Sequence, residues 1–159
     1  MKCVVQRVSD ARVRVDGEIV GEIGPGQLVL ACVQRRDTEK DIAWMAAKLV
    51  SLRIFPNADG SKSFDRDVRE ISGGILLVSQ FTIAADTTQG RRPSFIDAAG
   101  GEQGKELFDR LVAAVAAAGV PVATGRFGAE MKVELVNDGP ATFIVESPSV
   151  PSSGTPGEG

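Results

Sequence analysis

The sequence contains no histidine and no tyrosine among its 159 residues. Without histidine, every hydrolase that uses a histidine base and every histidine-ligated metal site is excluded. The two cysteines, Cys3 and Cys32, are too few for a disulfide framework and lack the spacing of a zinc site, so we expect buried, inert thiols. We predict neither a metal nor a cofactor, and any catalysis must use a carboxylate, a lysine, a hydroxyl, backbone groups or the substrate itself.

Long apolar runs are also missing. No stretch of about 18 apolar residues is present, so no transmembrane helix is predicted. Charge at Lys2 and Arg7 comes too early for the apolar stretch of a signal peptide. The net charge of −3 argues against a protein that coats polyanions, although it permits a local basic patch. We therefore predict a cytoplasmic protein with no membrane and no DNA partner.

Most of the chain has the composition of one globular domain. Hydrophobic residues make up 43% and charged residues 25% of the sequence, which is ordinary for such a domain. From residue 147 onward the composition shifts to serine, proline and glycine, with almost nothing to bury. We predict a folded domain over residues 1–146 and a disordered tail over 147–159.

The apolar pattern predicts several strands. A hairpin is expected across Asp16 and Gly17, because this dipeptide supplies the positive φ angles of a two-residue turn. Continuous apolar runs at 28–33 and 75–78 suit buried strands. We expect a further half-buried strand to end at Asn137.

Two helices are expected between these strands. One begins near Thr38, which forms a capping-box pattern with Asp41, and the other spans about residues 102–118. The last strand is predicted at 141–146. Two helices among such strands favour a single α+β domain with a largely antiparallel, barrel-like sheet.

The segment at 79–82 (SQFT) is the densest in polar chemistry. Strand alternation would place Ser79 and Phe81 on one face and Gln80 and Thr82 on the other. An ordinary strand edge explains these residues equally well from the sequence. A threonine nucleophile normally needs an adjacent base, and no histidine can supply one.

Two other segments have both a plain and a functional interpretation. Residues 137–142 (NDGPAT) have the composition of a turn, but the Gly139–Pro140 bond can also be cis at an intrinsic cost of about 0.5–1 kcal/mol. Adjacent Arg91 and Arg92 are ordinary surface charge, or contact phosphates near whatever site the SQFT strand builds.

Together, segments 79–82 and 137–142 resemble the two signature motifs of the D-aminoacyl-tRNA deacylases, also called D-tyrosyl-tRNA deacylases. The resemblance covers essentially residues 1–146. It extends over further segments at 5–8, 16–17, 90–95 and 125–131.

This resemblance implies a homodimeric enzyme that hydrolyses the ester between a D-amino acid, or mischarged glycine, and tRNA. It also implies that the 2′-hydroxyl of the tRNA, rather than a protein side chain, promotes hydrolysis, and that a cis Gly-Pro bond reaches into the partner subunit's pocket. By resemblance, the pocket is formed by Ser79, Gln80, Phe81 and Thr82, the chiral screen by Gly139 and Pro140, its brace by Arg7, and the adenosine pocket by Phe127 and Met131.

Two alternatives belong to other functional classes. The first is a hydrolase in which Thr82 attacks the ester and forms an acyl-enzyme. The second is a non-catalytic RNA-binding dimer that keeps the fold without turnover.

Overall fold

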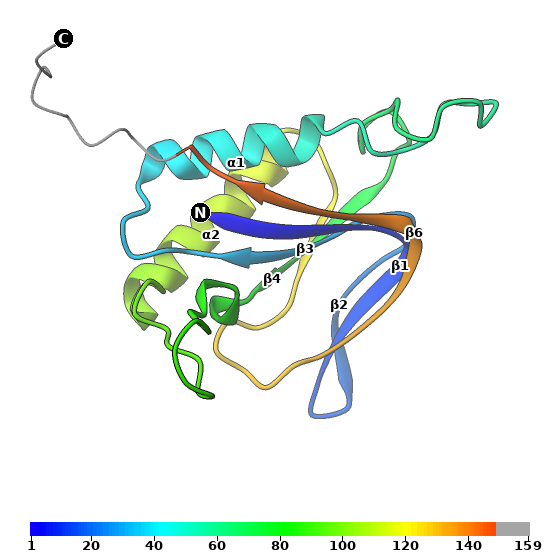
Figure 1. Cartoon of the computed structure of the whole chain (residues 1–159). Coiled ribbons are helices and arrows are strands. Elements are labelled where there is room, and N and C mark those ends of the chain that lie inside the picture. Colours follow the sequence, from blue (N-terminus) through cyan, green and yellow to red (C-terminus); the bar gives the residue numbers. More distant parts are fainter. Residues whose placement is uncertain (149–159) are drawn as a thin grey trace, which may run out of the picture.

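The computed structural model describes residues 1–148, so most of the predicted tail, residues 149–159, lies outside the described residues. The described chain forms one α+β domain (Figure 1). Its elements in chain order are β1 (Lys2–Val15), β2 (Glu18–Ile23), β3 (Gly26–Cys32), α1 (Glu39–Ser51), β4 (Gly74–Ser79), the 3-10 helix η1 (Phe81–Ala84), α2 (Gly101–Ala117), β5 (Val122–Thr124) and β6 (Lys132–Glu146).

The sheet is mixed and runs in the order β2-β1-β3-β4-β5, with β6 on the remaining edge of β1. β1 pairs antiparallel with β2, as the predicted hairpin requires, and also with β3 and β6. β4 instead pairs parallel with both β3 and β5, so the largely antiparallel sheet also contains parallel neighbours. The reason is that α1 and α2 lie between these strands in the chain, and parallel neighbours require such crossovers.

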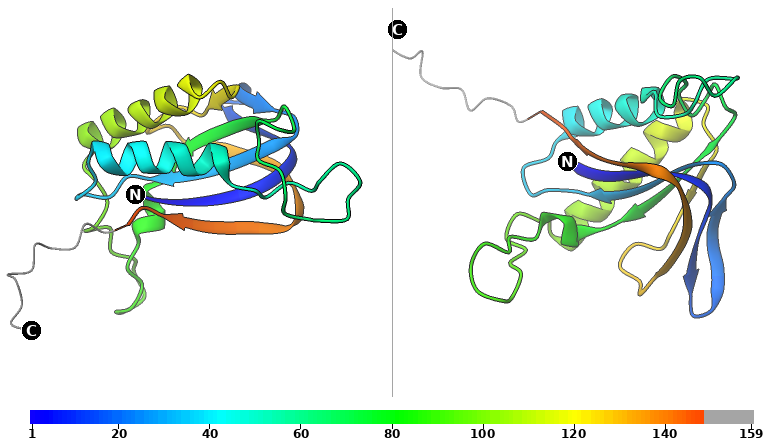
Figure 2. Two further views of the ribbon diagram at one scale, coloured as in Figure 1. Left: turned by 90° about the horizontal axis from the view of Figure 1, so that it is seen from above. Right: turned by 45° about the vertical axis from the view of Figure 1, so that its right-hand side comes forward.

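The sheet curls until β2 approaches β5, which produces the expected barrel-like shape. At Gly21 of β2, an added Cβ would lie 2.1 Å from the carbonyl oxygen of Thr124 in β5, so only glycine permits this approach. The two helices pack against each other on one outer face of the sheet (Figure 2). No helix within residues 1–148 is long and apolar enough to cross a membrane.

β4 is buried on both faces, which explains its unbroken apolar sequence. Ile75 and Leu77 face the helices, whereas Leu76 and Val78 face the inside of the barrel. The strand therefore joins two apolar layers and brings its last residue, Ser79, to the rim of the barrel.

Local sequence signals account for the hairpin and for the first helix. Asp16 and Gly17 have φ angles of 51° and 81°, and Val15 pairs with Glu18 across the turn. At the start of α1, the Thr38 hydroxyl accepts from the amide of Lys40 at 3.3 Å. The amide of Thr38 in turn donates to the carboxylate of Asp41 at 2.8 Å, which confirms the predicted capping box.

β6 is one strand rather than the two predicted. Its pairing with β1 shifts register on both sides of Val8, opposite Asn137, and then resumes. The Asn137 side-chain amide donates to the carbonyls of Arg7, at 3.0 Å, and Ala141, at 3.2 Å. These bonds hold the irregular segment against β1, so the turn-like composition produces a bulge instead of a break.

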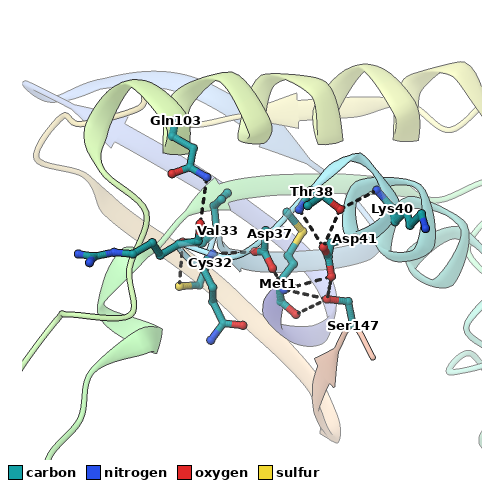
Figure 3. Close-up of polar contacts among 11 residues, drawn as sticks. Met1, Cys32, Val33, Asp37, Thr38, Lys40, Asp41, Gln103 and Ser147 are labelled. Atoms are coloured by element: carbon teal, nitrogen blue, oxygen red, sulfur yellow. Dashed lines mark hydrogen bonds and ion pairs between the residues drawn. The ribbon is translucent and has the colours of Figure 1, made fainter. Parts of the chain in front are cut away.

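A buried ion pair ties both ends of the domain to the start of α1 (Figure 3). The amino group of Met1 donates to Asp37 at 2.5 Å and to the hydroxyl of Ser147 at 2.8 Å. That hydroxyl in turn donates to Asp41 at 2.7 Å. Ser147 is buried, so this first residue of the predicted tail belongs to the folded domain.

We predict that Asp37→Ala lowers the free energy of unfolding by about 3–5 kcal/mol, because it leaves a buried ammonium group without its charge partner. Urea denaturation measures this loss. The matched control is Asp109→Ala, which breaks an exposed ion pair with Lys105 and should cost at most about 1 kcal/mol. Equal losses for the two variants would show that the buried pair contributes no more than a surface one.

Candidate functional site

The parallel strands β3, β4 and β5 end at one edge of the sheet, at Cys32, Ser79 and Thr124. In open α/β sheets, ligands bind outside the carboxyl ends of parallel strands. Here the amide of Gln80, the first residue after β4, donates to the carbonyl of Ala31 near the end of β3 at 2.8 Å. This edge of the sheet is therefore where a ligand site is expected.

A pocket of about 290 Å³ opens at this edge. Its size and its mainly apolar wall suit part of a small organic ligand. The residues that line it are Val78, Ser79, Gln80, Phe81, Phe127, Gly128, Ala129, Met131 and Val133.

Aromatic contacts fix both sides of the pocket. The ring of Phe81 packs edge-on against Phe95, with centroids 5.1 Å apart. The ring of Phe127 packs against Phe108 of α2, with centroids 6.0 Å apart. Phe81 nevertheless remains 57% exposed and Phe127 37% exposed, so both rings keep surface available for a ligand.

The SQFT segment is a strand end followed by a helical turn. β4 stops at Ser79, and Phe81–Ala84 forms η1, so the strand alternation considered for these four residues does not apply. The side-chain amide of Gln80 donates to the hydroxyl of Thr82. Thr82 is exposed beside the pocket but is not part of its lining.

The described residues that line the pocket include no carboxylate, lysine, arginine or cysteine. The polar side chains of the lining are those of Ser79 and Gln80, and neither is an acid or a base at neutral pH. Within residues 1–148, no group of three His, Cys, Asp or Glu side chains could hold a metal ion. The pocket can therefore bind and orient a ligand, but its own side chains offer no general base.

The second motif lies elsewhere in the domain. The peptide bond between Gly139 and Pro140 is cis, and both residues are exposed. The guanidinium of Arg7 reaches this segment: its Nε donates to the carbonyl of Asp138 at 2.7 Å, while Nη1 donates to the carbonyl of Ile54 at 2.8 Å. Arg7 is buried and connects the segment to Ile54, three residues beyond the end of α1.

Strand register separates the two motifs within one chain. Arg7 pairs with Gln27 near the start of β3, whereas Ser79 pairs with Ala31 near its end. Four residues of strand correspond to about 13 Å. The dipeptide 139–140 does not line the pocket of its own chain.

The structure thus gathers five of the nine site residues named from the sequence at the pocket, with Thr82 beside it and Arg7, Gly139 and Pro140 apart. It also adds wall residues that sequence reasoning missed, Val78, Gly128, Ala129 and Val133. The period-two alternation of a strand could have placed Val133 beside Met131. Gly128, which has a φ of 77°, carries a signal for a turn but none for a pocket.

Both cysteines are buried and unpaired, as expected. Burial raises the pKa of the Cys3 thiol to about 12 and also raises the pKa of Cys32. Because the thiolate is the nucleophile, a raised pKa keeps both thiols protonated near neutral pH and so suppresses their reactivity.

We expect iodoacetamide at pH 8 to leave Cys3 and Cys32 of the native protein unmodified, and to alkylate both after unfolding in urea. Mass spectrometry of the two samples gives the extent of modification. Native labelling of Cys3 at the rate of the unfolded chain would mean that the thiol is neither buried nor protonated.

Comparisons with known proteins agree on one family. A family model described as D-Tyr-tRNA(Tyr) deacylase matches residues 4–146. A D-aminoacyl-tRNA deacylase of Geobacter sulfurreducens is 54% identical over 153 residues, covering 96% of this chain and 99% of the relative. One of Chlorobaculum parvum is 52% identical over 149 residues, covering 93% of this chain and 99% of the relative.

Solved structures show the same architecture. A c-Myc DNA unwinding element binding protein superposes with a TM-score of 0.89 at 37% identity, covering 94% of this chain and 100% of the other. A probable eukaryotic D-amino acid tRNA deacylase superposes with a TM-score of 0.79 over 91% of this chain and 97% of the other. At 20% identity, the latter supports the fold alone.

Proposed function

Since this chain belongs to the D-Tyr-tRNA(Tyr) deacylase family and is a hydrolase of D-aminoacyl-tRNA, we propose that its pocket binds the 3′-terminal adenosine and that the tRNA itself supplies the catalytic hydroxyl. The observation that carries this proposal is the absence of an acid or base from the described lining of the pocket. We propose that the reaction takes place in the cytoplasm, the compartment predicted from the sequence.

The pocket supplies binding and orientation. Phe81 and Phe127 offer exposed ring surface on which a base can stack, and Met131 adds a polarizable apolar contact. Ser79 and Gln80 provide hydrogen-bonding groups for the ribose or the ester. Holding the ester in one orientation can by itself supply a large part of a rate enhancement.

The chemistry is hydrolysis of one ester bond. A water molecule adds to the ester carbonyl, the bond from the carbonyl carbon to the 3′-oxygen breaks, and the 3′-oxygen takes up the proton. The neighbouring 2′-hydroxyl promotes these steps from within the substrate. The products are the free D-amino acid and the tRNA.

We propose that Gly139 and Pro140 screen chirality from the partner subunit of a homodimer. Their separation from the pocket of their own chain supports this arrangement. A rigid backbone wall can reject an L side chain sterically, and glycine, which has no side chain, passes the same wall. Mischarged glycyl-tRNA is therefore a second expected substrate.

Exposed apolar side chains support the homodimer. Val136 and Ile144 of β6 are 53% and 69% exposed, and Phe64, which packs edge-on against Phe143 of the same strand, is 52% exposed. Within residues 1–148, β6 pairs with β1 alone, so its other edge is open in the described part of the chain. An edge strand with apolar neighbours favours association with another copy.

We predict that Thr82→Ala keeps kcat for D-aminoacyl-tRNA within about tenfold of the original, because no base activates the Thr82 hydroxyl. By contrast, a substrate that ends in 2′-deoxyadenosine, with the amino acid on the 3′-oxygen, should react at least about 100-fold more slowly. Single-turnover deacylation measures both rates.

Mass spectrometry of quenched reactions gives the matching control. A covalent aminoacyl adduct on Thr82, together with normal hydrolysis of the 2′-deoxy substrate, would favour the threonine-nucleophile mechanism. Failure to hydrolyse any D-aminoacyl-tRNA, with tRNA binding retained, would favour the non-catalytic RNA-binding dimer.

A further inference from the structure

Arginines without a charge partner gather at the pocket edge of the sheet. Six other arginines each have a carboxylate oxygen within 4.0 Å. Arg66, near Phe55, instead donates to the carbonyl of Pro56. The remaining arginines have no carboxylate within 4.0 Å in the described part of the chain, and all of them are exposed. We call this group the arginine rim; it consists of Arg35, Arg36, Arg91, Arg92 and Arg126.

The arginine rim follows the carboxyl ends of all three parallel strands. Arg35 and Arg36 lie just after β3, and Arg126 lies just after β5. Arg91 and Arg92 lie in the loop that follows β4 and η1. The pocket is lined from the same strand ends, so its mouth and these guanidinium groups share one edge of the domain.

Backbone contacts fix the segments that carry the rim. The amide of Arg35 donates to the carbonyl of Asp97 at 2.9 Å, and the side chain of Gln103 in α2 donates to the carbonyl of Arg35 at 3.1 Å. Asp86 and Ser94 exchange two backbone hydrogen bonds, of 2.8 and 2.9 Å, and so close the loop between them. The main chain is held while the guanidinium groups stay free.

The loop that carries Arg91 and Arg92 is also coupled to the pocket. Phe95, just beyond its closure, packs on Phe81 of the pocket wall. On the other side, Arg126 directly precedes Phe127, which lines the pocket and packs on α2. A ligand seated between Phe81 and Phe127 would thus be flanked by arginines on both sides.

Free guanidinium groups beside a pocket suit a ligand that carries phosphates. Guanidinium forms bidentate bonds with phosphate oxygens and stays charged at all physiological pH values. Acidic side chains also lie in these segments: Asp86 bonds to Thr88, and Asp97 shares a shallow hollow with Arg35 and Arg36. These carboxylates weaken the positive field, which favours contacts with phosphates at set positions over general polyanion binding.

We propose that the arginine rim docks the phosphates of the tRNA acceptor stem while the 3′ end enters the pocket. This proposal rests on the proposed function, because only that function brings a polynucleotide to this edge. The overall charge of −3 makes a local rim necessary, since the protein as a whole repels RNA.

The test measures binding of uncharged tRNA by fluorescence anisotropy over a range of salt concentrations. Two double variants, Arg35→Gln with Arg36→Gln and Arg91→Gln with Arg92→Gln, are compared with the control Arg53→Gln with Arg69→Gln. The control removes the same charge from two arginines that carry ion pairs away from the pocket. Each rim variant should raise the Kd for tRNA. It should also lower the slope of log Kd against log salt concentration by about 1.4–1.8, because each of the two lost phosphate contacts contributes about 0.7–0.9.

Hydrolysis assays separate docking from chemistry. With D-aminoacyl-tRNA, the rim variants should raise KM and leave kcat unchanged. With a 3′-O-D-aminoacyl adenosine, which has no phosphate, they should match the control in both constants. If the unaltered protein does not hydrolyse this ester but still binds tRNA in a way that depends on the rim, the proposed function is contradicted and the docking is supported.

Two results would overturn the docking. One is that the rim and control variants bind tRNA with the same Kd and the same salt slope, even if both deacylate D-aminoacyl-tRNA normally. The other is equally tight, equally rim-dependent binding of a DNA hairpin of matched length, which would indicate a surface for nucleic acid in general.

Discussion

The register of β1 against its three partners is the constraint on which the rest of the structure depends. β1 runs the length of the sheet, between β3 and β6 in its first half and between β2 and β6 in its second. Because side chains alternate along a strand, a slip of one residue would turn Arg7 from the helix side to the inside of the barrel. The same register places Arg7 beside Gln27, at the far end of β3 from the pocket. Because Arg7 bonds to Asp138, this register places the Gly139–Pro140 segment near the start of β3, whereas the pocket of the same chain lies at the end of β3.

The chemistry proposed for the pocket follows from what the strand ends contribute. Parallel strands β3, β4 and β5 deliver backbone, aromatic rings and two neutral polar side chains to one edge, with no titratable group in the described lining. Such a site can select and orient a substrate, and a substrate with its own hydroxyl beside the ester needs little more. Charge is kept outside the pocket, in the arginine rim, where it can contact phosphates without entering the reaction.

Local signals in the sequence predicted much of the fold, because each depends on a few adjacent residues. The Asp16–Gly17 turn requires positive φ angles, and the Thr38 capping box needs only its own first turn of helix. Three features escaped prediction because they depend on distant partners. Asn137 closes the bulge in β6 against β1, Ser147 is held by the amino group of Met1, and the parallel pairing of β4 follows from the packing of α1 and α2. For the site, the residues from the sequence alone indicated only a polar strand end. Phe127 and Met131 were placed at the pocket by the resemblance, because nothing local to them signals a ligand.

The most direct test of a site shared between subunits is activity of a mixed dimer. One subunit carries Ala129→Arg, which fills the pocket, and the other carries Gly139→Val, whose Cβ would lie 2.5 Å from the side-chain oxygen of Asn137. Each variant alone should be inactive on D-aminoacyl-tRNA. If the screen acts on the partner's pocket, the purified mixed dimer contains one intact site and should show about half the activity of the unaltered dimer. A mixed dimer no more active than either parent would contradict the shared site and place pocket and screen in the same subunit.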